Sequence, residues 1–103
     1  MTKVAKFILL DVNPDRRDEF FALLDKNRRH TQSESGTLEW TIHDVQDQPD
    51  AVALYELYES QAASDEHEET SPPLKELLAR LDDFLTAPPS ILALNVSRAR
   101  LDP

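Results

Sequence analysis

The chain has 103 residues, a length that suits one modest hydrophobic core, so we expect residues 1–103 to form a single domain. Its formal net charge of −9 repels phosphate backbones, and nucleic acid is therefore not an expected partner. The chain contains no cysteine, which excludes disulfides, thiolate metal ligands and a cysteine nucleophile.

Nothing in the sequence indicates a membrane protein. The apolar runs, such as Phe7–Leu10, are far shorter than the roughly 20 residues of a membrane-spanning helix. The chain does not open on a charged and then apolar leader, so we expect no signal peptide. The missing cysteines are compatible with a reducing compartment, and we expect a cytoplasmic protein.

A strand and a helix are predicted first. Val4–Val12 carries apolar side chains on both parities, which is typical of a strand buried on both faces. Asn13 and Pro14 predict a helix start, with asparagine as the cap and proline at the first position. Gly36, the only glycine, is expected to close the connection after this helix with a positive φ. The inward face of the helix is predicted from helical spacing to hold Phe20, Leu23, Leu24, Asn27 and Thr31.

A hairpin follows in the prediction. Thr37–Val45 alternates in polarity and should place Leu38, Trp40 and Ile42 on one face of a strand. A polar loop over 46–50 should connect it to a strand over 51–59.

Two helices and a last strand complete the chain. Ser60 is predicted to cap a short helix, and Ser71 precedes a proline that starts the next one. Pro88 and Pro89 end that helix, and Ile91–Val96 is predicted to be a strand. An apolar stripe on the second helix is expected to hold Leu74, Leu77, Leu78, Leu81 and Leu85.

The predicted order β-α-β-β-α-α-β indicates an α+β, ferredoxin-like fold, with one antiparallel sheet and helices on a single face. The other sheet face would carry apolar side chains, and each Å² left in water costs about 25 cal/mol. We therefore predict a homodimer that packs sheet face against sheet face.

The chain resembles the antibiotic biosynthesis monooxygenase (ABM) domain family over Lys3–Arg98. The family pattern has a glutamate close before a glycine, an aromatic residue four positions later, a strand ending in glutamate-x-aromatic, and a histidine on the following helix. The matching residues are Glu34-Ser35-Gly36-Thr37-Leu38-Glu39-Trp40, Leu54-Tyr55-Glu56-Leu57-Tyr58 and Ala63 to His67.

This resemblance implies a ferredoxin-like domain that dimerises into an α/β barrel. It implies several activities, because the family includes cofactor-independent monooxygenases acting on polycyclic phenols, haem-degrading enzymes and an isomerase of a phosphorylated autoinducer. The haem-degrading members have an asparagine on the first strand and a haem-ligating histidine on the third helix. Phe7 and Leu77 stand in those neighbourhoods here, so haem is not expected.

Three residues are candidates for proton chemistry. His67 has the side chain whose ordinary pKa of about 6.5 lies nearest working pH, although it could be a surface residue of an acidic run. Glu56 lies among apolar neighbours of its strand and should be paired, with His67 as the expected partner. That pair is either a structural lock or an oriented acid–base pair. Asn27 faces inward, and its amide binds either a ligand oxygen or nearby backbone.

The expected substrate pocket is aromatic and apolar. Trp40 suits the wall of a site for a flat aromatic ring, and Tyr58 could donate its phenol to a substrate oxygen. Phe20 and Leu24 on the inward helix face complete the expected lining. The alternative for these side chains is ordinary core packing.

No metal and no cofactor are expected. The three histidines lack metal-ligand spacing, and one glycine cannot form a nucleotide-binding loop. The resemblance therefore favours a cofactor-independent monooxygenase that oxidises a phenol or quinol with dioxygen. The alternatives are a small-metabolite isomerase of the autoinducer-processing type and a non-catalytic ligand-binding domain.

Overall fold

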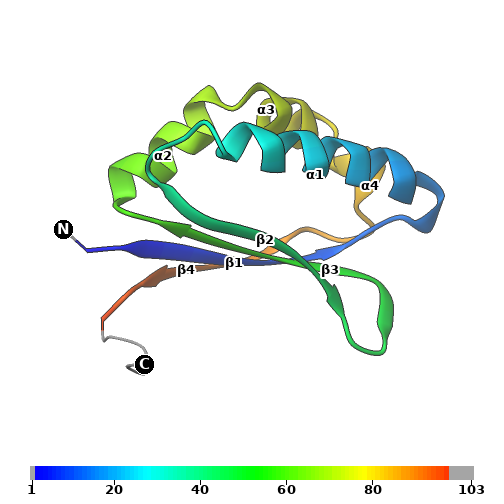
Figure 1. The fold of residues 1–103 in the computed structure, drawn as a ribbon. Helices are drawn as coiled ribbons and strands as arrows, with labels where there is room; N and C mark the ends of the chain where they lie inside the picture. The colour runs from blue at the N-terminus through cyan, green and yellow to red at the C-terminus, as the bar shows by residue number, and fades with distance from the viewer. Residues whose placement is uncertain (1, 98–103) are drawn as a thin grey trace.

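The computed structural model describes residues 2–97 and shows a sheet covered by helices on one face (Figure 1). The four strands are antiparallel in the order β2-β3-β1-β4, which confirms the α+β, ferredoxin-like prediction. The elements are β1 (Val4–Asp11), a 3-10 turn η1 (Pro14–Arg16), α1 (Arg17–Thr31), β2 (Thr37–Val45), β3 (Gln48–Tyr58), α2 (Gln61–Thr70), α3 (Pro72–Ala79), α4 (Leu81–Phe84) and β4 (Ser90–Asn95).

The predicted helix caps are confirmed. The side chain of Asn13 accepts a hydrogen bond from the Asp15 backbone at 3.0 Å and caps η1, which leads into α1. Ser60 Oγ accepts from the Ala63 backbone at 3.2 Å at the start of α2. Ser71 Oγ accepts from the Leu74 backbone at 3.4 Å at the start of α3. Each cap satisfies an amide that has no partner inside its helix.

The hairpin between β2 and β3 is tighter than predicted. Val45 pairs with Gln48, so the connection is only Gln46 and Asp47, and Pro49 lies within the strand. Asp47 has φ of 62°, a left-handed conformation that aspartate tolerates better than most residues. A positive φ is common in tight hairpin turns, and the polar composition of 46–50 does not reveal which residue adopts it.

The predicted alternation of β2 is wrong at Leu38. The register slips between Thr37 and Glu39, so Leu38 is an extra residue of a β-bulge and is 46% exposed. Beyond the bulge the alternation holds, and Trp40 lies opposite Glu56 on the helix-covered face.

The predicted leucine stripe is wrong in part. Arg80 leaves the helical region, with φ of −120° and ψ of 19°, and divides the expected helix into α3 and α4. Leu78 precedes the break and is 50% exposed, while Leu77 and, beyond the break, Phe84 are buried. The stripe assumed one uninterrupted helix, and the interruption changes which side chains face the sheet.

Gly36 serves close packing rather than a positive φ. Among residues 2–97 no glycine has a positive φ, which corrects the prediction. A Cβ atom at Gly36 would lie 2.5 Å from the Cβ of Ala63. The missing side chain therefore lets the start of β2 approach α2 closely.

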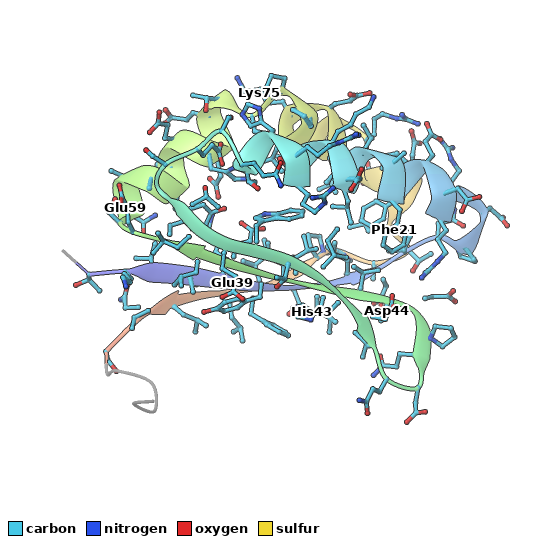
Figure 2. The ribbon with its side chains drawn as sticks, in the orientation of Figure 1. Phe21, Glu39, His43, Asp44, Glu59 and Lys75 are labelled. Atoms are coloured by element: carbon cyan, nitrogen blue, oxygen red, sulfur yellow. The ribbon has the colours of Figure 1, made fainter. Side chains whose placement is uncertain are left out.

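The core lies between the helices and the sheet. Figure 2 shows Phe21 between α1 and the sheet, and Glu39 and His43 on the uncovered sheet face. The buried apolar cluster consists of Leu10, Val12, Phe20, Leu23, Leu24, Trp40, Val52, Leu54, Leu77 and Phe84. No helix in the described part of the chain is long and apolar enough to cross a membrane.

Candidate functional site

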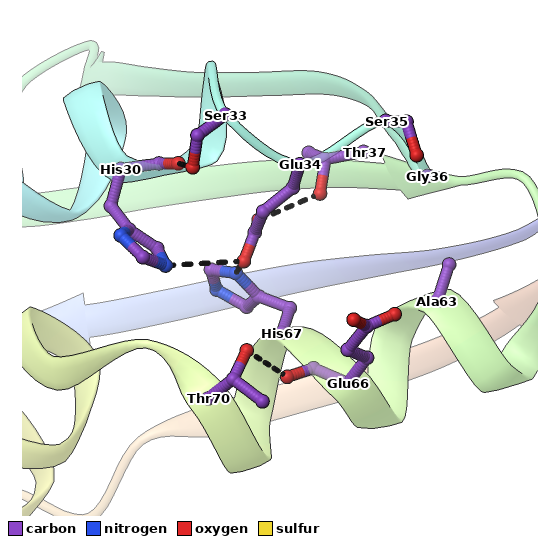
Figure 3. Close-up of a pocket in the computed structure, with 10 residues that line it drawn as sticks. All are labelled: His30, Ser33, Glu34, Ser35, Gly36, Thr37, Ala63, Glu66, His67 and Thr70. Carbon is purple, nitrogen blue, oxygen red and sulfur yellow. Dashed lines mark hydrogen bonds and ion pairs between the residues drawn. The ribbon is translucent and has the colours of Figure 1, made fainter.

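Two hollows lie around the connection between α1 and β2. The first has a volume of about 310 Å³ and is drawn in Figure 3. The second has a volume of about 250 Å³, and both include Thr37 in their walls. The first is lined by His30, Ser33, Glu34, Ser35, Gly36, Thr37, Ala63, Glu66, His67 and Thr70. The second is lined by Arg28, Thr31, Gln32, Thr37, Leu38, Glu39 and Trp40.

His67 and Glu34 form a buried pair in the first hollow. The side chain of His67, on α2, is only 2% exposed. Its Nδ1 lies 2.8 Å and 3.0 Å from the two carboxylate oxygens of Glu34. Figure 3 draws the two side chains in contact. An ionised carboxylate only accepts hydrogen bonds, so Nδ1 donates and carries a proton.

Glu34 is held by further side chains. Thr37 Oγ1 donates to Glu34 Oε1 at 2.9 Å. On the other side, His30 Nε2 lies 3.6 Å from Glu34 Oε2 (Figure 3). The carboxylate is thus contacted from α1, from β2 and from α2.

Glu56 and Tyr58 form a second buried pair on β3. The phenol of Tyr58 donates to Glu56 Oε1 at 2.5 Å. Burial raises the pKa of Glu56 above its ordinary value, and the hydrogen bond from Tyr58 and the imidazole of His67 oppose the rise. Burial, and then the charge of Glu56, also raise the pKa of Tyr58, so the phenol keeps its proton.

Trp40 connects the pair on β3 with the second hollow. It lines that hollow and is 8% exposed, and it also belongs to the apolar core cluster. Its indole nitrogen is buried without a hydrogen-bond partner of good geometry in residues 2–97. The indole still lies close enough to Glu56 to lower the pKa of that carboxyl slightly.

The expected direct pair of Glu56 and His67 is not formed. His67 bonds to Glu34 and Glu56 bonds to Tyr58, while the rings of Tyr58 and His67 lie 5.8 Å apart. Glu56 lies opposite Trp40 on the neighbouring strand and two residues before Tyr58 on β3, whereas the loop before β2 places Glu34 against the imidazole. The four side chains nevertheless form one buried polar cluster.

Sequence reasoning missed Glu34 as a functional candidate. Its signal was present, because Glu34 begins the string that resembles the family pattern. However, a loop has no periodicity, so the direction of its side chain cannot be predicted from spacing.

Of the predicted site residues, only His67 and Trp40 line the two hollows, and Glu56 and Tyr58 line neither. Asn27 is 2% exposed, and its Oδ1 accepts a hydrogen bond from Ser71 Oγ at 2.8 Å, which ties α1 to the cap of α3. Phe20 and Leu24 are completely buried in the core cluster and line neither hollow. Within residues 2–97, no three histidine or acidic side chains are placed to hold a metal ion.

The fold of this chain is shared with solved structures, and it is the ferredoxin-like fold of one antiparallel sheet with helices on one face. Rv0793 from Mycobacterium tuberculosis is 31% identical, with a TM-score of 0.81 over 98% of this chain and 97% of that one. A Caulobacter crescentus protein described as a candidate antibiotic biosynthesis monooxygenase is 19% identical. Its TM-score is 0.85 over 94% of this chain and 92% of that chain, which shows the shared fold.

The family is defined by the sequence itself. The chain belongs to the antibiotic biosynthesis monooxygenase (ABM) family, whose sequence profile matches residues 4–86. This finding confirms the resemblance identified from the sequence. An uncharacterised Synechocystis protein, sll1783, is 27% identical over 82 residues, which cover 80% of this chain and 55% of that protein. The chain thus spans about half the length of this curated relative.

Proposed function

We propose that the protein is a cofactor-independent monooxygenase that oxidises a phenol or quinol with dioxygen. The observation that carries the proposal is the His67–Glu34 pair, a buried imidazole held at 2.8 Å by a carboxylate in the wall of a hollow. Such a pair is suited to accept a proton from a bound hydroxyl group. Membership of the ABM family supports the reaction class.

In this reaction the substrate supplies all the electrons. A base removes the phenolic proton, the phenolate gives one electron to dioxygen, and the two radicals combine into a peroxide at a ring carbon. The base returns the proton to the peroxide, which then loses water as that carbon becomes a carbonyl. A phenol and dioxygen thus give a quinone and water, without an outside reductant.

We assign His67 as the base that takes and returns the proton. We assign Glu56 and Tyr58 to the buried wall behind it, where the raised pKa of Glu56 lets it take up a proton more readily than an exposed glutamate. Trp40 is proposed to contact the flat ring from the second hollow. For Asn27 we propose a supporting role, because its hydrogen bond goes to the cap of α3.

A second candidate is proton transfer without oxygen. Glu34 is bonded to the imidazole of His67, and the same imidazole lowers the pKa of Glu56, so two carboxylates interact with one imidazole in the polar cluster. This arrangement also suits an isomerase that moves a proton between two carbons of a small oxygenated metabolite. A non-catalytic ligand-binding domain would use the same hollow but would leave the ligand unchanged.

We also propose that the functional unit is a homodimer. The sheet face without helices exposes large apolar side chains, and its members Phe7, Leu92 and Leu94 are 40%, 58% and 43% exposed. Adjacent apolar residues of this kind mark an interaction surface. A second copy of the sheet would cover them.

The test is oxygen consumption by metal-stripped protein with a panel of phenols and quinols, corrected for autoxidation. We expect saturable uptake with at least one compound, and a loss of about 100-fold or more in His67→Ala. Glu69→Ala, an exposed change on the same helix, is the matched control and should keep full activity. Melting temperatures of both variants separate loss of the base from loss of the fold.

Three results would redirect the proposal. Turnover without oxygen uptake would support the isomerase. Binding without any product would support the ligand-binding domain. Uptake that survives in His67→Ala at full rate would remove His67 from the reaction.

A further inference from the structure

The side chain of Glu34 is held in place by its neighbours in the absence of a ligand. Its side chain is 16% exposed although it lies in a connection between elements. Oε1 accepts from Thr37, and Oε2 faces His30 across 3.6 Å. Thr37 and His30 thus restrain the carboxylate that bonds to His67.

The backbone supports the same geometry. The Glu34 amide donates to the carbonyl of Thr31 at 3.0 Å, and its carbonyl accepts from the Thr37 amide at 3.3 Å. The close approach of Gly36 and Ala63 then sets how far this connection lies from α2. The distance between Glu34 and His67 is therefore determined by main-chain packing.

The geometry has a consequence for the imidazole. A neutral histidine carries one proton, and the other ring nitrogen is then the acceptor. Within residues 2–97, the hydrogen bonds of the His67 side chain all use Nδ1. If Nδ1 keeps the proton for Glu34, Nε2 is the nitrogen that can accept a proton from a ligand.

We propose that Glu34 is the positioning residue of the site, and that it holds His67 in the tautomer with the proton on Nδ1 and the accepting lone pair on Nε2. This assignment rests on the proposed use of His67 as a base. It adds a residue and a specific nitrogen to that function. Glu34 acts through His67 and is not proposed to contact the substrate.

The test begins with nuclear magnetic resonance of the protein without substrate. Nitrogen-15 shifts and long-range proton couplings of His67 report which ring nitrogen is protonated. At a pH where the ring is neutral, we expect Nδ1 protonated and Nε2 bare in the wild type. In Glu34→Ala we expect the proton to move wholly or partly to Nε2.

A control separates a specific contact from a general charge effect. Glu66 is exposed and lines the same hollow, but its side chain makes no hydrogen bond to His67 within residues 2–97. Glu66→Gln should therefore leave the tautomer unchanged. Glu34→Asp keeps the charge but places the carboxylate farther from the imidazole, and we therefore expect a mixture of the two tautomers.

Several outcomes would overturn the proposal. These are a wild-type His67 protonated on Nε2, a tautomer that is the same in Glu34→Ala, or a ring that stays doubly protonated across the accessible pH range. Melting curves of Glu34→Ala show whether the protein is folded. If that variant is unfolded, the tautomer of the wild type and the mixture of tautomers in Glu34→Asp decide whether the proposal holds.

Kinetics complete the test once a substrate is known. Glu34→Gln should lower kcat about 10- to 100-fold with little change in KM, because the neutral amide holds the imidazole less firmly. The two proposals fail separately. If His67 has the expected tautomer but no oxygen is consumed, the role of Glu34 stands and the monooxygenase is refuted. If oxygen uptake depends on His67 but the ring is protonated on Nε2, the monooxygenase stands and the role of Glu34 is refuted.

Discussion

At the scale of single residues, Glu56 is the most unusual group in the molecule. It is 6% exposed, and burial raises its pKa above the ordinary value of 4.5 despite a hydrogen bond from Tyr58. A buried carboxylate of this kind costs stability when it is charged. A carboxyl group with a raised pKa binds its proton more tightly than an exposed glutamate does, which makes Glu56 a candidate for proton transfer.

The pH dependence of stability follows from this shift. Because the native carboxyl binds its proton more tightly than the unfolded one, stability should fall as pH rises from about 4.5 through the native pKa. Glu56→Gln keeps an acceptor for Tyr58 and removes the titrating group. The stability of this variant relative to the wild type should therefore increase as pH rises from about 4.5 through the native pKa of Glu56. Thermal unfolding between pH 4 and 8 measures the difference.

The control for this experiment is Glu69→Gln, which removes a carboxylate from the exposed face of α2. The difference in stability between Glu69→Gln and the wild type should change little with pH. A difference between wild type and Glu56→Gln that stays constant from pH 4 to 8 would show that Glu56 does not titrate differently in the native state.

At the scale of elements, the site depends on the contact between α2 and the start of β2. Gly36 and Ala63 meet there so closely that an added Cβ would lie 2.5 Å from the one already present. This contact places the Glu34 loop over His67. The two elements contribute opposite partners of the buried pair, so their spacing controls the geometry of the hydrogen bond.

Gly36→Ala should therefore destabilise the fold by about 1–3 kcal/mol through overpacking. Ala63→Gly should cost up to about 1 kcal/mol through helix propensity. We expect the double variant to be more stable than the sum of the two changes predicts, because the new methyl group then has room. Urea unfolding of the four proteins measures the coupling, and strictly additive effects would refute the contact.

At the scale of the whole molecule, the two faces of the sheet differ in what covers them. The helices cover one face (Figure 1). Phe7, Leu9, Leu92 and Leu94 remain 36% to 58% exposed on or beside the other face. The large net charge favours solubility but does not cover this surface. A second copy of the chain is the simplest cover for it.

If the dimer forms through the sheet, Leu92→Glu should shift the protein toward monomer at micromolar concentration, because two carboxylates would be buried at the interface. Leu78→Glu is a matched control, since Leu78 is 50% exposed on α3, away from the sheet face. It should leave the assembly unchanged. Analytical ultracentrifugation distinguishes the cases, and a wild-type monomer at that concentration would refute the dimer.

The order of elements could be predicted from the sequence because each has a local signal. Alternation marks the strands, and Ser60 and Ser71 cap helices where a hydroxyl satisfies the first amides. Errors arose where one residue interrupts a pattern. The bulge at Leu38 and the break at Arg80 depend on packing against other elements, which periodicity does not report.

The candidate site was predictable only in part. Parity correctly placed Trp40, Glu56 and Tyr58 on the helix-covered sheet face, and helical spacing correctly turned His67 inward. Phe20 and Leu24 share the inward face of α1 but belong to the core, because a pocket and a core present the same apolar pattern.

The sequence alone therefore determined the fold class and the inward direction of Asn27, Glu56, Tyr58 and His67, because these depend on local patterns of polarity and capping, and its motifs determined the family. The tertiary structure alone decided the pairing. His67 meets Glu34 rather than Glu56 because the connection between α1 and β2 passes over α2, where Gly36 allows close approach. Contacts between distant parts of the chain are fixed by packing, and no local pattern encodes them.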